Sequence, residues 1–134
     1  MIVADANLIV ARCMNGGRSE TARRIYDRDP VWIAPKLWQA EFVSALLKYQ
    51  RATALSAADR ARALFFAESF MHSMDYDSDL HEVTAVAMKT QCSAYDSCYI
   101  ALAEEMRTKL VTFDGGILAN APHVAVSPEQ FLAA

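Results

Sequence analysis

The sequence predicts an α/β domain in which a central parallel sheet lies between layers of helices. Short apolar runs rich in β-branched and aromatic residues alternate with longer segments of helical periodicity. No repeat, low-complexity block or Pro/Gly-rich linker interrupts the 134 residues, which include only four glycines and four prolines. Strands and helices that alternate in this way usually form parallel sheets with covered faces. We therefore expect one domain over residues 1–134.

Four apolar runs are predicted as strands. They are MIVA at 1–4, VWIA at 31–34, KLVTF at 109–113 and HVAV at 123–126. The segment 74–76 is a candidate for a short additional strand. Two helices are expected between the first two main strands, four before the third, one before the fourth and one after it.

Helix starts carry clear capping signals. SAAD at 56–59 has the Ser-x-x-Asp capping pattern, and Ser127-Pro128-Glu129 places a cap before proline at the first helical position. The helix predicted at 35–50 has an apolar stripe that we expect to face the core, formed by Leu37, Phe42, Val43, Leu46 and Leu47. The helix at 63–74 is apolar on more than one face, which indicates either deep burial or a surface for a partner. Trp32 and Trp38 are expected in the core.

The composition indicates a compact, unexported protein. Hydrophobic residues make up 54% of the chain and charged residues 22%, which suits a single core. Cys13, Cys92 and Cys98 are odd in number and form no CxxC pair, so we expect reduced thiols in the cytoplasm. The apolar N-terminus lacks a basic region and is too short to span a bilayer, so no membrane association is expected.

Four carboxylates fall where a parallel sheet places its ligand site. Asp5 ends the first strand and Asp114 ends the strand at 109–113. Asp96 lies in the first turn of the helix before that strand, and Glu41 lies in the helix after the second strand. Ligands of open parallel sheets bind beyond the carboxyl ends of the strands, so all four side chains are candidates for one site.

Converging carboxylates repel one another, and a hard divalent cation removes that repulsion. Mg²⁺ and Mn²⁺ prefer oxygen ligands, with water or substrate phosphate completing the shell. Such a site performs phosphate chemistry without a nucleophilic side chain. Asn7, two residues after Asp5, is a candidate to hydrogen-bond a ligand carboxylate or a bound water.

Each acid also has a simpler interpretation. Asp96 follows Ser93 with capping-box spacing, and Asp114 before Gly115 suits a turn. Asp5 can be a turn residue at a strand end, and Glu41 a partly exposed helix residue. The common location of all four, each within apolar sequence, favours a site.

Four blocks resemble those of the PIN-domain ribonucleases: VADANLIV, P-x-L-W-x-x-E-F-x-x-A-L, AYDSCYIALAEE and LVTFDGGIL. Their order and the chain length are similar to VapC-type toxins of bacterial type II toxin–antitoxin (VapBC) systems. The resemblance implies a PIN-like, Rossmann-like α/β/α fold and an Mg²⁺- or Mn²⁺-dependent endoribonuclease. It makes Asp5, Glu41, Asp96 and Asp114 the catalytic, metal-binding acids. It further implies a VapB-like antitoxin that covers the acidic site, and a homodimer.

The chain departs from that family pattern at two places. Ser44, which we expect to support the site by hydrogen bonding, stands where the family often has asparagine after the glutamate. Gly115 and Gly116 stand where a basic residue often follows the last aspartate, which puts a local phosphate contact in doubt.

The net charge of −3 argues at first against nucleic-acid binding. Without the four site acids the chain has 13 basic and 12 acidic residues, so RNA binding through the metal and scattered cations is compatible with the composition. The candidate cations are Arg12, Arg18, Arg23, Arg24, Lys36, Lys48 and Arg51.

The sequence is also compatible, to different degrees, with other functions. A PIN-like module that binds without cleaving remains open. A phosphoacceptor domain of receiver or haloacid-dehalogenase type fits less well, because Asn7 stands where a second acid is needed. DYDSD at 75–79 starts like a calcium loop but lacks the following glycine and is expected to lead into a helix capped near Ser78. The spacing of His72, His81 and His123 does not predict zinc.

Overall fold

The computed structural model describes residues 1–53, 55–71 and 74–134. His72 therefore lies outside the described residues. The strands are β1 (Ile2–Ala4), β2 (Trp32–Pro35), β3 (Asp75–Tyr76), β4 (Leu110–Val111) and β5 (Ala125–Val126). The helices are α1 (Ala6–Cys13), α2 (Ser19–Arg28), α3 (Trp38–Ala52), α4 (Ala57–Met71), α5 (Leu80–Thr90), α6 (Ala94–Glu105), α7 (Gly115–Asn120) and α8 (Pro128–Ala133).

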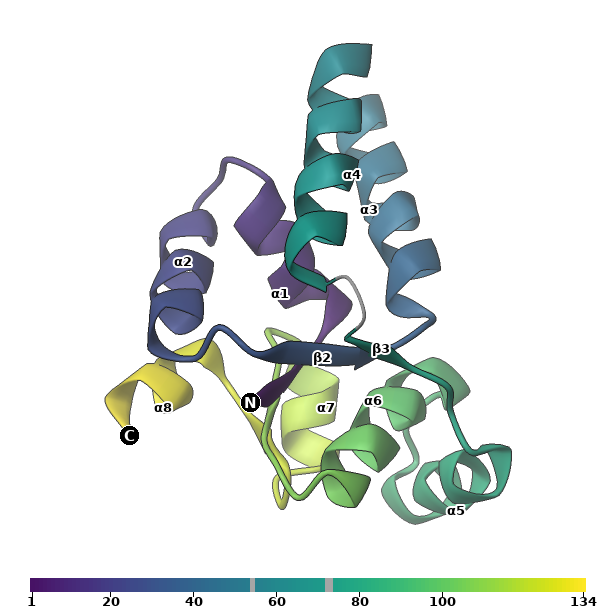
Figure 1. Ribbon diagram of the computed structural model, residues 1–134. Coiled ribbons are helices and arrows are strands. Elements are labelled where there is room, and N and C mark those ends of the chain that lie inside the picture. Colours follow the sequence, from purple (N-terminus) through teal and green to yellow (C-terminus); the bar gives the residue numbers. More distant parts are fainter. Residues whose placement is uncertain (54, 72–73) are drawn as a thin grey trace.

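The five strands form an all-parallel sheet in the order β3-β2-β1-β4-β5. Figure 1 shows α1 to α4 on one side of the sheet and α5, α6 and α7 on the other, with α3 and α4 extending away from it as a long helical hairpin. The predicted three-layer α/β/α class and the order of the elements are confirmed. The short strand expected at 74–76 is β3.

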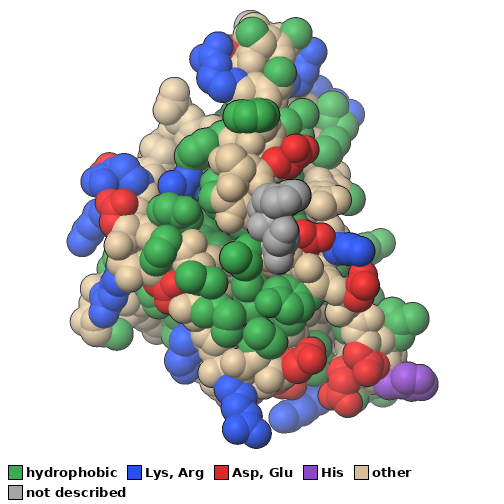
Figure 2. Space-filling view, in the orientation of Figure 1, with side chains coloured by type: hydrophobic (Ala, Val, Ile, Leu, Met, Phe, Trp, Pro, Cys, Tyr) green, Lys and Arg blue, Asp and Glu red, His purple; other side chains and the backbone are tan. Residues whose placement is uncertain are grey.

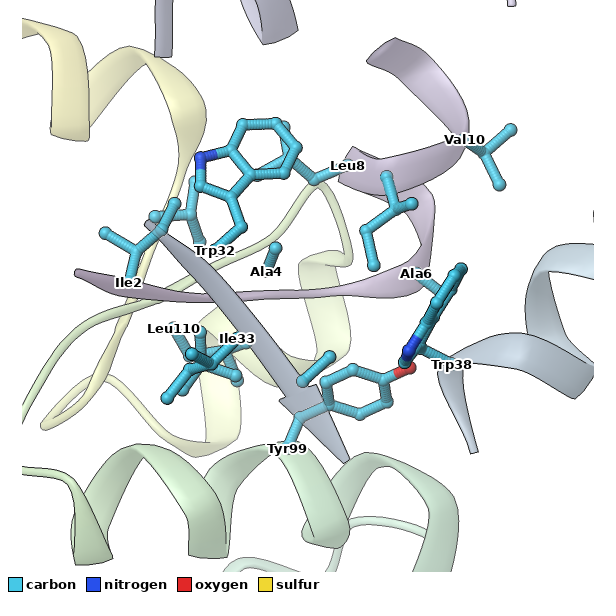
Figure 3. Packing of buried hydrophobic residues seen from close by; sticks show 14 of the residues in the cluster. Ile2, Ala4, Ala6, Leu8, Val10, Trp32, Ile33, Trp38, Tyr99 and Leu110 are labelled. Carbon is cyan, nitrogen blue, oxygen red and sulfur yellow. The ribbon is translucent and has the colours of Figure 1, made fainter. Parts of the chain in front are cut away.

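The core forms where the apolar strands meet both helix layers. Trp32 on β2, Phe42 on α3 and Tyr99 on α6 are at most 1% exposed, and Trp38 is also buried. Figure 3 shows Trp32 and Leu8 on one side of the sheet and Tyr99 and Leu110 on the other. Burying each large apolar side chain contributes roughly 1.5–3 kcal/mol, so β1 and β2 are held firmly in place.

One prediction about a helix face is corrected. Val43 and Leu47 do not join the core stripe of α3: they are 44% and 46% exposed, because the buried row is Trp38, Phe42 and Leu46, and each exposed residue lies about 100° round the helix from its buried neighbour. On α4, Met71 is buried and Phe65 is 77% exposed, so of the two alternatives for this helix deep burial is excluded and a partner surface stays a prediction.

The helix expected to be capped near Ser78 is α5. Its N-cap is the adjacent residue Asp79, whose carboxylate accepts hydrogen bonds from the backbone N–H groups of His81 and Glu82. The other predicted caps are confirmed. Ser56 accepts from the Asp59 N–H, and Ser127 forms a complete capping box with Gln130.

Candidate active site

The main cavity of the described structure opens at the carboxyl edge of the sheet, between α1, α3 and α6. Its volume is about 1050 Å³. Asp5, Glu41, Asp96 and Asp114 all line it, although they come from four separate parts of the chain. Asn7 and Ser44 line the same cavity. The parallel sheet therefore brings together every residue that the sequence nominated for the site.

Asp5 is the most buried of the acids, at 6% exposure. It ends β1 and caps α1, and its Oδ1 accepts a hydrogen bond of 2.7 Å from the Ala6 N–H. Burial raises the pKa of Asp5 to about 6; the Thr112 and Ala6 hydrogen bonds oppose the rise, and the charges of Glu41 and Asp96 add to it. A fraction of Asp5 is therefore protonated near neutral pH when no cation is present.

Thr112 connects the ends of β1 and β4. Its hydroxyl donates to Asp5 Oδ2 and accepts from the Asp114 N–H at 2.9 Å and from Asn7 Nδ2 at 3.4 Å. One hydroxyl can donate once and accept twice, so this buried group is fully satisfied. Asn7 Oδ1 in turn accepts from the Phe113 N–H at 3.3 Å. The network fixes the orientation of the Asp5 carboxylate.

Glu41 is held from the opposite helix layer. It lies in the first turn of α3, and its Oε1 accepts a 2.7 Å hydrogen bond from the Tyr99 hydroxyl on α6. Burial raises the pKa of Glu41, Tyr99 opposes that rise, and the nearby charge of Asp96 adds to it. The hydrogen bond thus favours the ionised carboxylate and sets its direction.

Asp96 and Asp114 both serve helix termini and line the cavity. The Asp96 N–H is capped by Ser93 at 3.1 Å, and Asp114 Oδ1 accepts from the Ile117 N–H at 2.9 Å as the N-cap of α7. Burial raises the pKa of Asp96, and the charge of Asp114 raises it further. The Asp114 carboxylate therefore caps α7, and the Asp96 N–H is part of the Ser93 cap of α6; both residues still line the cavity.

The donor set suits a hard cation that keeps part of its water. Within the described ranges, no group of three or more His, Cys, Asp and Glu side chains is placed so that it could hold a metal ion. Mg²⁺ commonly binds through one or two carboxylates and retains several waters, so a site for it does not require three protein ligands. All four lining acids offer oxygen, the ligand type that Mg²⁺ and Mn²⁺ prefer.

Sequence reasoning missed Thr112 and Tyr99. The residue types carried a weak signal, since Thr112 lies two positions before Asp114 and Tyr99 three after Asp96. Their partners lie 107 and 58 residues away, so no local pattern could assign the contacts.

The nominated cations have different roles in the structure. The Arg12 guanidinium packs on Tyr26, Phe66 and Phe70, away from the acids. Arg23 pairs with Glu20 and Asp27, and Lys36 pairs with Asp77. Arg18 and Lys48 line the acidic cavity. Only these last two of the nominated cations therefore lie where a ligand in the cavity could contact them.

The remaining features lie away from the cavity. His81 is exposed, and His123 Nε2 lies 2.7 Å from Glu104 Oε1. Asp77, Ser78 and Asp79 line a separate, smaller cavity. None of the helices, as far as the structure describes them, is both long enough and apolar enough to cross a membrane.

The sequence has relatives among known proteins. Residues 2–123 match the PIN domain family. Ribonuclease VapC3 of Pyrobaculum aerophilum is 30% identical over 126 residues, which cover 90% of this chain and 95% of that protein. VapC ribonuclease Mb0985 of Mycobacterium bovis and ribonuclease VapC9 of Mycobacterium tuberculosis are each 32% identical over 114 residues, covering 85% of this chain and 86% of theirs.

The fold has a counterpart among solved structures. The crystal structure of PAE2754 from Pyrobaculum aerophilum superposes with a TM-score of 0.77 at 25% identity, covering 98% of this chain and 92% of that one. The similarity extends to an archaeon as well as to mycobacteria, so it is not confined to bacteria. The match across residues 2–123 and the agreement in fold show that this chain belongs to the PIN domain family.

Proposed function

We propose that this protein is an Mg²⁺- or Mn²⁺-dependent endoribonuclease and the toxin of a toxin–antitoxin pair. The observation that carries the proposal is the meeting of Asp5, Glu41, Asp96 and Asp114 in one cavity of a PIN domain. The VapC ribonuclease names of its relatives support RNA as the substrate. The match to the PIN family over residues 2–123 argues against a function as a receiver or as a haloacid-dehalogenase-type phosphatase.

The acids would hold the cation, with Asp5 and Asp96 as direct ligands and Glu41 and Asp114 beside them. When bound, a divalent ion supplies a polarised water and offsets the charge that develops on a phosphodiester. Thr112 and Tyr99 keep the Asp5 and Glu41 oxygens oriented toward the cavity by donating hydrogen bonds. Asn7 and Ser44 line the cavity where they could hydrogen-bond a coordinated water.

A toxin of this kind needs an inhibitor, and we expect a VapB-like antitoxin in the same cytoplasm. An antitoxin arginine would form charge-assisted hydrogen bonds with the cavity carboxylates. The exposed apolar residues of the α3–α4 hairpin, Val43, Leu47 and Phe65, offer a surface for that partner or for a second copy of the chain.

The test compares two aspartates that share one structural role. Asp96 and Asp59 both stand three residues after a serine N-cap, and in each case the serine oxygen lies 3.1 Å from the aspartate backbone nitrogen. Only Asp96 lines the acidic cavity. Purified, partner-free wild type, Asp96→Asn and Asp59→Asn are incubated with structured and single-stranded RNAs, with Mg²⁺, with Mn²⁺ or with chelator.

We expect metal-dependent cleavage by wild type and Asp59→Asn, and none by Asp96→Asn. Equal loss in both variants would mean that Asp96 acts only as a helix residue. Failure of wild type to cleave RNA that it binds would favour the PIN-like binding module. Cleavage that persists in Asp96→Asn or in chelator would contradict the assignment.

A further inference from the structure

Three of the four cavity acids have a carboxylate oxygen that already accepts a hydrogen bond from the protein. Both oxygens of Asp5 do so, and so does Oδ1 of Asp114. On Glu41 the Tyr99 hydroxyl donates to Oε1, and no partner is found for Oε2 among the described residues. An ionised carboxylate offers about four lone pairs. These hydrogen bonds therefore leave fewer lone pairs of each residue for a cation.

Tyr99 is a fixed donor. Its side chain is fully buried, and α6 packs on β1 and β2. Figure 3 shows its ring extending from α6 with the hydroxyl turned toward α3, which carries Glu41. Close-packed interiors hold side chains in well-defined rotamers. The hydroxyl therefore stays 2.7 Å from Glu41 Oε1 and does not move aside when a ligand enters the cavity.

Tyr99 also has a simpler relation to Glu41. A buried hydroxyl requires an acceptor, and Glu41 supplies one. However, Tyr99 stands three residues after Asp96, on the same side of α6, and its partner is a second cavity acid from the opposite helix layer. The hydrogen bond thus joins two segments that both supply acids to the cavity, so its effect on a bound cation can be measured.

Divalent cations differ in how they use carboxylates. Ca²⁺ takes about 6–8 oxygens at roughly 2.3–2.6 Å and often binds both oxygens of one carboxylate. Mg²⁺ requires a near-octahedral shell at about 2.0–2.1 Å and keeps several waters. Mn²⁺ likewise suits an octahedral set of oxygens. A glutamate with one oxygen already engaged therefore suits Mg²⁺ and Mn²⁺ better than Ca²⁺.

We propose that Tyr99 is a positioning residue that sets the cation selectivity of the cavity. By holding Oε1, it presents Glu41 as a ligand with a single oxygen, Oε2, and so favours Mg²⁺ and Mn²⁺ over Ca²⁺. Tyr99 does not contact the cation and acts only through Glu41. This inference rests on the proposed metal-dependent function and extends it to a residue outside the four acids.

Tyr99 is the donor whose removal disturbs least else. Thr112 also accepts two hydrogen bonds, so its replacement changes the end of β4 as well. Ala6 and Ile117 donate from the backbone, which a side-chain substitution leaves in place. The Tyr99 hydroxyl has Glu41 as its one hydrogen-bond partner within the described part of the chain, and Tyr99→Phe removes a single oxygen atom while keeping the ring.

The experiment measures cation binding without RNA and without activity. Electron paramagnetic resonance of free Mn²⁺ gives the Mn²⁺ dissociation constant, and displacement of bound Mn²⁺ by Ca²⁺ gives the Ca²⁺ constant for the same site. The proteins are wild type, Tyr99→Phe, Glu41→Ala and the double variant. Tyr76→Phe is the matched control, because it removes a tyrosine hydroxyl from β3, outside the acidic cavity.

We expect wild type to bind Mn²⁺ more tightly than Ca²⁺. Tyr99→Phe should weaken Mn²⁺ binding about ten-fold or more, as loss of a residue that orients a ligand usually does. Ca²⁺ binding should be unchanged or tighter, because both Glu41 oxygens become available, so the preference for Mn²⁺ falls about ten-fold or more. Tyr76→Phe should keep the wild-type preference. When Glu41→Ala is already present, adding Tyr99→Phe should not change the preference further.

Equal weakening of both cations by Tyr99→Phe would show that the hydroxyl is only structural and would overturn the inference. So would a wild type without preference for Mn²⁺, or a change of preference that persists in the Glu41→Ala background. Absence of Mn²⁺ binding by wild type would overturn this inference and the metal-dependent function together.

Measuring RNA cleavage by wild type separates the two proposals. Mn²⁺-dependent cleavage together with an unchanged preference in Tyr99→Phe would reject the inference and leave the nuclease proposal intact. The expected preferences in a wild type that cuts no RNA would retain the inference and reject the nuclease proposal.

Discussion

Replacing Asp5 by asparagine should make the metal-free protein more stable at neutral pH and less sensitive to pH. Asp5 has a pKa raised from 3.8 to about 6 in the native protein. The native state therefore binds this proton more tightly than the unfolded chain, so the free energy of unfolding falls as pH rises through the interval between these two values. Asparagine does not titrate and removes this dependence.

The magnitude follows from the same two pKa values. Each pKa unit corresponds to about 1.4 kcal/mol, so ionised Asp5 destabilises the native state by about 3 kcal/mol above pH 6. Asparagine keeps an oxygen for the Ala6 N–H but no longer accepts the Thr112 proton, which costs about 1 kcal/mol. Asp5→Asn should thus be about 2 kcal/mol more stable than wild type at pH 7.5, and within about 1 kcal/mol of it at pH 4.

The assay is urea unfolding followed by circular dichroism, in chelator, at intervals from pH 4 to pH 8. Glu129→Gln is the control, because it removes one exposed carboxylate on α8 outside the cavity. Parallel pH profiles for wild type and Asp5→Asn, or a variant that is less stable throughout, would refute the argument that the site acids destabilise the metal-free fold.

Two further predictions concern Asp5 and its hydrogen-bond partner Thr112. Saturation with Mn²⁺ at about 100 times its dissociation constant should raise the free energy of unfolding of wild type by roughly 2.7 kcal/mol. The same urea titration measures this rise, and an equal rise in Asp5→Asn would count against the metal site. Thr112→Val should lower stability by about 1–3 kcal/mol, because the Asp114 N–H and the buried Asp5 carboxylate lose their shared partner. Thr112→Ser keeps the hydroxyl, so it should be more stable than Thr112→Val and should cleave RNA as wild type does. If the serine variant were as unstable as the valine variant, the methyl group of Thr112, and not its hydroxyl, would account for the loss.

Much of the fold could be read along the chain because its signals are local. Apolar runs of strand length separated by capped helical segments predict the order of the elements, and even β3 at Asp75–Tyr76 follows from a short run. A cap depends on residues three apart, so Ser56 and Ser127 could be recognised without the fold. Ser78 and Asp79 are adjacent, and both residue types are common N-caps, so the sequence alone could not show which of them caps α5.

The sequence was a weaker guide to which face of each helix is buried, because burial depends on the segments that pack against the helix. Val43 and Leu47 continue the apolar pattern of α3, but each lies about 100° round the helix from its buried neighbour, Phe42 or Leu46, so they remain exposed. In Figure 2 apolar side chains form a broad group at the centre of the visible face, flanked by charged residues. Periodicity identified an apolar stripe and could not show where the core ends.

By itself the sequence determined the fold class, because strand and helix signals are local, and it nominated the four acids as candidates, because each lies next to the end of a strand or in a helix beside one. The tertiary structure decided the strand order β3-β2-β1-β4-β5, which places Asp5 and Asp114 on neighbouring strands. It also decided the contacts of Thr112 and Tyr99, which join segments 107 and 58 residues apart. A hydrogen bond requires atoms to meet in space, and only the folded chain brings such distant residues together.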